Sequence, residues 1–164
     1  MNPFLAAVNQ KRLFAALLLG EAAGAADSHL REALVQGALS HLGTALQLYF
    51  AEVAASYQCR DALQATSPGA LERQLSAMGK TAAEVSEILA LAEDDSSWLS
   101  RVVACQRALS APPGTVSRRG REDIIDTLSI APDQDTQFNL ADVERWLAAF
   151  TSMVERQRES MVEC

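Results

Sequence analysis

The segment LREALVQGALSHLGTALQLYFAEVAASY, residues 30–57, decides the fold of this chain. Its apolar residues recur every three or four positions along two adjacent seams, which is the spacing of an α-helix. One seam holds Val35, Leu39, Leu42, Leu46, Tyr49 and Val53, and the other holds Leu34, Ala38, His41, Ala45, Leu48 and Glu52. The rest of the circumference is only a narrow polar stripe of Glu32, Gln36, Ser40, Gly43 and Gln47. We therefore predict a long helix over about residues 28–57 that neighbouring helices cover on most sides, the central rod of a bundle.

The composition of the 164-residue chain favours the same fold class. Hydrophobic residues make up 49% of it and aromatic residues only 5%, so the core must come mainly from Ala and Leu, which are strong helix formers. No stretch alternates apolar and polar residues for long enough to predict a strand. A chain of this length buries roughly 68–70% of its unfolded surface, ample for a core without disulfides or metals. We predict one all-α domain over residues 1–164, a bundle of about five or six helices.

Capping residues indicate where the helices begin and end. A first helix over about residues 3–23 ends at Gly24, and the second begins after Asp27 or Ser28. Further helices are predicted to start at Ser67-Pro68, at a capping box of Thr81 and Glu84, after the polar run 94–97, and at Asn139 with Asp142. Residues 112–138 lack apolar periodicity and contain Pro-Pro-Gly, so we expect an irregular and mobile loop there.

Charge and cysteine usage exclude several classes of partner. The net charge of −7 argues against general binding to nucleic acid or anionic lipid, and the arginines at 118–121 are offset by acidic residues directly after them. The apolar run 13–19 follows two basic residues like a signal peptide, but an amphipathic first helix is the better interpretation, and the run is too short to span a bilayer. Three widely spaced cysteines without a Cys-x-x-Cys pair are typical of reduced thiols, so we expect a cytoplasmic protein.

No arrangement of residues specifies a reaction. The chain has no Glu-x-x-His motif, no Gly-rich phosphate loop and no Gly-x-Ser-x-Gly elbow. Its two histidines, His29 and His41, lie about 18 Å apart along one predicted helix and cannot share a metal ion from there. We predict no catalytic residue, no metal site and no cofactor, and a non-enzymatic role is favoured.

Polar residues on the buried side of the central helix are the candidates for a binding site. His41 and Glu52 return to nearly the same face, with Tyr49 between them. Buried polar groups are normally paired with one another, so a structural role is the default and a ligand pocket the alternative. Near the C-terminus, Glu155 and Arg158 are interpreted as an exposed ion pair on one helix face.

Short motifs along the chain resemble one known family. They are Asn9-Gln10-Lys11, Leu13-Phe14-Ala15 with Glu21, Arg31-Glu32-Ala33, Ser40-His41-Leu42 with Ala45, Asp95 with Trp98-Leu99, and Arg158-Glu159. On these residues the chain resembles an uncharacterised family of small all-helical proteins from pseudomonads and related gammaproteobacteria. The resemblance implies a bacterial, cytoplasmic helical protein and adds no activity or substrate. It also makes Asn9 and Lys11 candidate ligand-binding residues, as part of either an exposed polar stripe or a polar pairing between helices.

Two classes of function fit these observations. The favoured one is a helical bundle that acts through protein–protein association, either as a homodimer or with another protein. Trp146, Phe150 and Met153 exceed what one helix face buries, so the last helix or an exposed Ala/Leu face of the first helix is the expected interface. The alternative is a small-molecule-binding or hydrolytic bundle with a pocket around His41. A nucleic-acid role through the arginines at 118–121 is a weaker third possibility.

Overall fold

A computed structural model describes residues 2–111 and 136–162 of the chain. Over these residues it holds six α-helices, one short 3-10 turn and no strand, which confirms the all-α prediction. The elements are α1 (Phe4–Gly24), α2 (Ser28–Ser56), the 3-10 turn η1 (Ala62–Gln64), α3 (Pro68–Ala77), α4 (Ala83–Glu93), α5 (Trp98–Ser110) and α6 (Leu140–Val162). Most of the loop predicted at 112–138, with its arginines at 118–121, lies outside the described residues.

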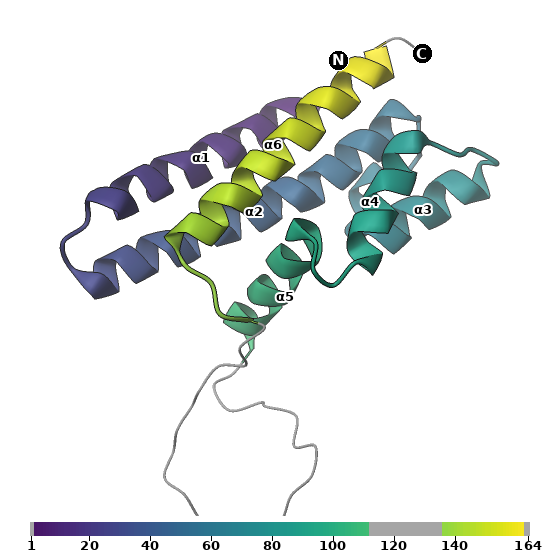
Figure 1. Cartoon of the computed structure of the whole chain (residues 1–164). Helices are drawn as coiled ribbons and strands as arrows, with labels where there is room; N and C mark the ends of the chain where they lie inside the picture. Colours follow the sequence, from purple (N-terminus) through teal and green to yellow (C-terminus); the bar gives the residue numbers. More distant parts are fainter. Residues whose placement is uncertain (1, 112–135, 163–164) are drawn as a thin grey trace, which may run out of the picture.

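The helix α2 is the centre of the bundle. It forms an antiparallel hairpin with α1, and α6 packs against both helices of this hairpin (Figure 1). Of the remaining helices, α3 and α5 also contact α2, and α4 packs between α3 and α5. This position agrees with the two apolar seams of α2, because a helix with apolar residues on two faces needs neighbours on more than one side.

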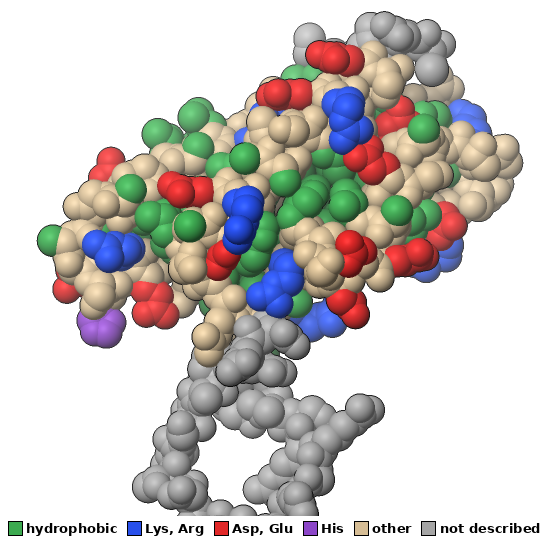
Figure 2. Space-filling view, in the orientation of Figure 1, with side chains coloured by type: hydrophobic (Ala, Val, Ile, Leu, Met, Phe, Trp, Pro, Cys, Tyr) green, Lys and Arg blue, Asp and Glu red, His purple; other side chains and the backbone are tan. Residues whose placement is uncertain are grey.

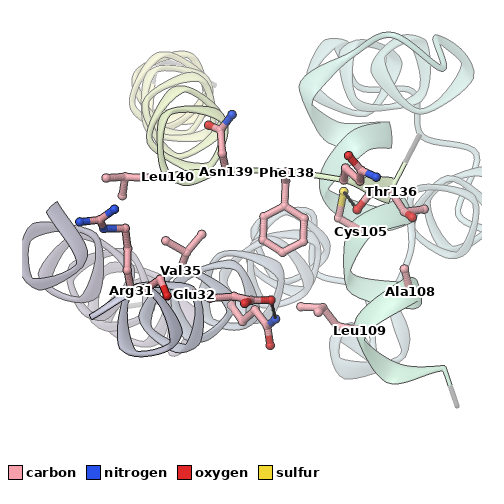
Figure 3. A pocket seen from close by; sticks show the side chains of 13 residues that line it. Arg31, Glu32, Val35, Cys105, Ala108, Leu109, Thr136, Phe138, Asn139 and Leu140 are labelled. Atoms are coloured by element: carbon pink, nitrogen blue, oxygen red, sulfur yellow. Dashed lines mark hydrogen bonds between the residues drawn. The ribbon is translucent and has the colours of Figure 1, made fainter. Parts of the chain in front are cut away.

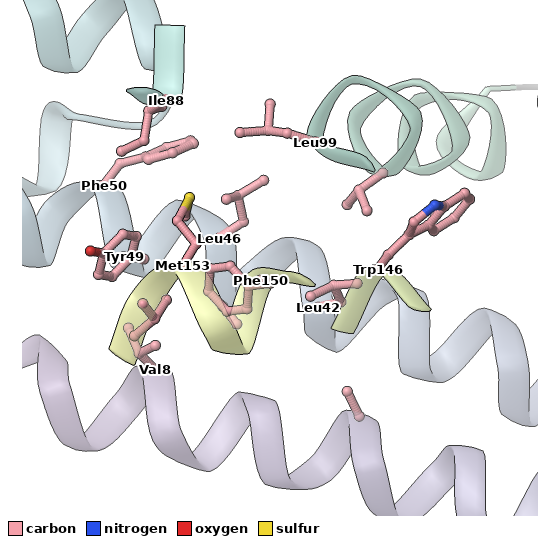
Figure 4. Packing of buried hydrophobic residues seen from close by; sticks show 14 of the residues in the cluster. Val8, Leu42, Leu46, Tyr49, Phe50, Ile88, Leu99, Trp146, Phe150 and Met153 are labelled. Atoms are coloured by element: carbon pink, nitrogen blue, oxygen red, sulfur yellow. The ribbon is translucent and has the colours of Figure 1, made fainter. Parts of the chain in front are cut away.

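All six helices contribute buried residues to the core, and its aromatic part lies where α2, α5 and α6 meet. Thirteen residues of α2 are buried, and the ring of Phe150 from α6 lies 6.0 Å from the ring of Tyr49 and 6.1 Å from that of Trp98 (Figure 4). Trp146 is only 5% exposed and Met153 only 2%, so the apolar residues of α6 are covered within their own chain. The uncovered apolar residues that suggested α6 as an interface are therefore absent. Of the two interfaces expected from the sequence, only the exposed face of α1 remains.

Side-chain caps confirm most of the predicted helix starts. Asp27 Oδ1 accepts a hydrogen bond from the backbone of Leu30 at 2.7 Å at the start of α2. At the start of α6, Asn139 and Asp142 each accept from the other's backbone N–H at 3.1 Å, which is a complete capping box. These bonds join residues three positions apart, so local sequence is enough to predict them.

The capping box predicted at Thr81 and Glu84 is wrong. Ala82 is the N-cap of α4 and makes no side-chain cap. The carboxylate of Glu84 turns inward instead, where it accepts hydrogen bonds from Tyr57 Oη at 2.9 Å and Ser160 Oγ at 2.8 Å. These partners come from elsewhere in the fold and compete with the local backbone for the same oxygens.

Candidate functional site

An ion pair between α2 and α6 accounts for one of the predicted site residues. Glu52 is 2% exposed, and Arg158 donates to it through Nε at 2.7 Å and Nη2 at 2.8 Å. The same guanidinium donates through Nη1 to Asn9 Oδ1 at 2.8 Å. Glu155, the predicted partner of Arg158, instead pairs with Arg12 at 2.8 Å. The prediction of an exposed Glu155–Arg158 pair is therefore wrong, because α6 turns Arg158 toward α2.

A second set of polar contacts joins α2, α4 and α6 nearby. Gln157 of α6 is buried; its Oε1 accepts from Tyr49 Oη at 2.8 Å and its Nε2 donates to Glu87 Oε2 at 2.7 Å. Arg156 donates to both carboxylate oxygens of Glu87, at 3.0 and 2.7 Å. Burial, together with the nearby charge of Glu52, raises the pKa of Tyr49, so its hydroxyl stays protonated and donates. Tyr49 and Glu52 thus have side-chain partners that the sequence did not identify.

His41 and Lys11 lie apart from these contacts. The imidazole of His41 is partly exposed and packs edge-to-face on the ring of Phe14, with the ring centroids 5.4 Å apart. Lys11 Nζ lies 5.7 Å from the centroid of the same Phe14 ring. Burial and the charge of Lys11 lower the pKa of His41, which favours the neutral imidazole. His41 lies eleven residues, roughly 16 Å, before Glu52 along α2.

The five predicted site residues therefore do not form one pocket. One cavity lies between α5 and α6, with a volume of about 940 Å³ and Trp98, Arg101 and Arg145 in its wall. Another, of about 490 Å³, lies between α2, α5 and residues 136–140 (Figure 3). A groove between α1 and α6 is lined by Asn9. None of these three is lined by His41, Lys11, Tyr49 or Glu52, whose ligand-binding role stays a prediction.

The outward side of α1 carries several small and apolar residues. Its exposed residues recur at steps of four and three and form what we call the outer face of α1: Ala6, Gln10, Leu13, Leu17, Gly20 and Gly24. The opposite side of the helix is buried through Val8, Ala15, Leu19 and Ala22. A surface helix normally carries a polar side toward solvent, whereas α1 is mainly apolar on both sides.

Exposed leucines mark this face as a candidate interaction surface. Leu13 is 55% exposed and Leu17 is 57% exposed. Figure 2 shows hydrophobic side chains spread over the upper left of the molecule, where α1 lies in Figure 1. The groove between α1 and α6 adjoins this face, since Leu13 and Ala16 line one wall and Leu147 lines the other. Contiguous apolar surface of this kind commonly marks a site of association.

The described residues contain no set of three His, Cys, Asp or Glu side chains placed to hold a metal ion. Cys59 and Cys105 are free and buried, and burial raises the pKa of both thiols, which lowers their reactivity. Within residues 2–111 and 136–162, none of the helices has the length and apolar character needed to cross a membrane.

Comparison with known proteins gives a family and no activity. No curated protein and no solved structure matches the chain. The model of one family of unknown function matches residues 1–164, which confirms the resemblance to an uncharacterised family but does not show its taxonomic range. The chain belongs to this family of unknown function, DUF6586.

Proposed function

We propose that this protein acts by association, and that the outer face of α1 is its docking surface for a second copy of the same chain. The observation that carries this proposal is the pair of exposed leucines, Leu13 and Leu17, on a helix with no continuous polar side. Full burial of one leucine side chain contributes about 1.5–3 kcal/mol, and pairing gains the share of this that belongs to the exposed part of Leu13 and Leu17 on each copy.

The spacing of the outer face suits an antiparallel pair of α1 helices. Steps of four and three make a seam like that of a coiled coil. If the two-fold axis passes midway between Leu13 and Leu17, each Leu13 lies opposite the partner's Leu17. Gln10 then lies opposite Gly20, and Ala6 opposite Gly24. Small residues toward both ends of the seam allow the helix axes to approach closely, and the pairing is self-complementary as a two-fold interface requires.

Analytical ultracentrifugation of the full chain at micromolar concentration tests the proposal. We expect a dimer for the wild type and a monomer for Leu17→Glu, because that change places a charge in the centre of the seam. Leu63→Glu is the matched control, since Leu63 is 68% exposed in η1, away from α1, and should leave the dimer intact. A wild-type monomer, or a dimer that survives Leu17→Glu with unchanged affinity, would refute the proposal.

The proposal also includes a bacterial origin for the protein and a cytoplasmic location. A bacterial origin among pseudomonads or their relatives rests on the sequence resemblance. A cytoplasmic location rests on the same resemblance and on the spacing of the three cysteines. Fractionation of the native cells, with the chain detected by antibody, tests the location.

A further inference from the structure

The cavity between α2, α5 and residues 136–140 has the size and lining of a small-molecule site. Its volume of about 490 Å³ lies within the range of ordinary ligand pockets. Val35 from α2, Leu109 from α5 and Phe138 contribute apolar surface from three different parts of the chain. In Figure 3 the ring of Phe138 projects into the space between α2 and α5. This arrangement is suited to an apolar chain or ring.

Hydrogen-bond donors lie at the edge of the same cavity. Arg31 Nη2 donates to the backbone oxygen of Ala25 at 2.5 Å, and the other N–H groups of Arg31 make no hydrogen bond within the described part of the chain. Asn139 Oδ1 accepts from the backbone of Asp142, and its amide nitrogen has no acceptor among the described residues. Both residues line the cavity and have donors left for a ligand.

An acidic side chain, Glu32, also lines this edge, and its hydrogen-bond partner is a neutral amide. Glu32 Oε1 accepts from Gln36 Nε2 at 3.1 Å, one turn further along α2. At the inner end, Cys105 is fully buried and its thiol donates to the backbone oxygen of Thr136 at 3.6 Å. The edge therefore offers a hydrogen-bonded acid–amide pair and the donors of Arg31 and Asn139, whereas the interior is apolar.

We propose that this cavity binds a small amphipathic carboxylate. Its apolar chain packs between Val35, Leu109 and Phe138, and its carboxylate accepts hydrogen bonds from Arg31. The charged, multiple-donor guanidinium matches a carboxylate better than it matches a neutral head group. The site shares no residue with the outer face of α1, so it does not depend on the proposed dimer.

Isothermal titration calorimetry with decanoate, and with decanol as the neutral analogue, tests this site on the full chain. We expect saturable binding of decanoate that Arg31→Gln weakens roughly tenfold or more, since hydrogen bonds to charged groups have that effect. Binding of decanol should change less than threefold by the same argument. Arg73→Gln on α3 is the matched control, because Arg73 is exposed and does not line this cavity.

A second variant tests the apolar part of the site. Ala108 is exposed at the end of α5 and lines the cavity, so Ala108→Phe should keep the helical circular dichroism and abolish decanoate binding by filling the space. Leu17→Glu should bind decanoate as the wild type does, whatever its effect on dimerisation. No saturable binding, unchanged binding by Ala108→Phe, or loss of binding in Leu17→Glu alone would each overturn this site.

Discussion

At the scale of single residues, the ion pair of Glu52 with Arg158 links α2 to α6. The carboxylate of Glu52 is almost completely removed from solvent and accepts two charged hydrogen bonds from one guanidinium. A buried ion pair contributes little to the free energy of unfolding, because the cost of removing both charges from water offsets their attraction. Removing only one of the two charged side chains destabilises the fold, however, because the other charge is then buried without a partner.

Arg158→Ala should therefore lower the free energy of unfolding by about 3–5 kcal/mol, because it leaves Glu52 buried and unpaired. Urea unfolding followed by circular dichroism measures this loss. Arg145→Ala is the control: the side chain of Arg145 is 72% exposed in its pair with Asp142, and such a pair contributes less than about 1 kcal/mol. The double variant Glu52→Gln, Arg158→Met should regain part of the loss. Equal losses for Arg158→Ala and Arg145→Ala contradict this account.

At the scale of the element, α1 combines a tightly packed inner side with an outer side that contains two glycines. A Cβ atom added at Gly20 would meet no other atom within 4 Å, and Gly20 has no left-handed backbone conformation. No contact within residues 2–111 and 136–162 therefore requires glycine at this position. Its small size is explained by the proposed dimer, in which another helix approaches the seam.

Gly20→Ala should raise the free energy of unfolding of the monomer by about 0.5–1 kcal/mol, because alanine is the better helix former. The measurement is urea unfolding in the Leu17→Glu background, where the proposed dimer is absent. Gly43→Ala is the comparison in α2, since its Cβ would lie 1.7 Å from Gln106 Nε2 and displace that side chain from Ser40. We expect a smaller gain there. A loss of stability for Gly20→Ala would show that the outer face is packed within one chain.

At the scale of the whole molecule, two glutamates of α4 connect the C-terminal ends of α2 and α6. Burial acts to raise the pKa of Glu84, but hydrogen bonds from its own backbone, Ser160 and Tyr57 outweigh it and the pKa is lowered. The hydrogen bonds from Arg156 lower the pKa of Glu87 despite its partial burial. Both carboxylates are therefore bound in their ionised form by the folded chain.

This linkage predicts a loss of stability in acid. The folded-state pKa values of Glu84 and Glu87 lie below the ordinary value of 4.5, so their stabilisation is complete above that pH and is lost as the pH falls through the folded-state values. Urea unfolding at a series of pH values should show a steeper decline for the wild type than for Glu87→Gln. Glu144→Gln, on the exposed side of α6, should retain the wild-type decline. An identical pH dependence in wild type and Glu87→Gln contradicts the linkage.

The sequence by itself determined the helices and most of their ends. The seams over residues 30–57 predicted a central helix, and the cap of Asp27 and the box of Asn139 with Asp142 lie where they were expected. These features depend on residues within one or two turns of each other. Helical spacing and capping involve only such near neighbours, so they can be inferred without knowing how the chain packs.

Only the tertiary structure decided which polar residues meet and which apolar residues are covered. Glu52 and Arg158 are 106 positions apart, and Glu84 leaves its predicted local cap for Ser160, 76 positions away. Trp146 is buried, whereas Leu13 and Leu17 are exposed, although all three lie in helices with apolar faces. The crossing and rotation of the packed helices select these partners, and many distant side chains together determine that packing.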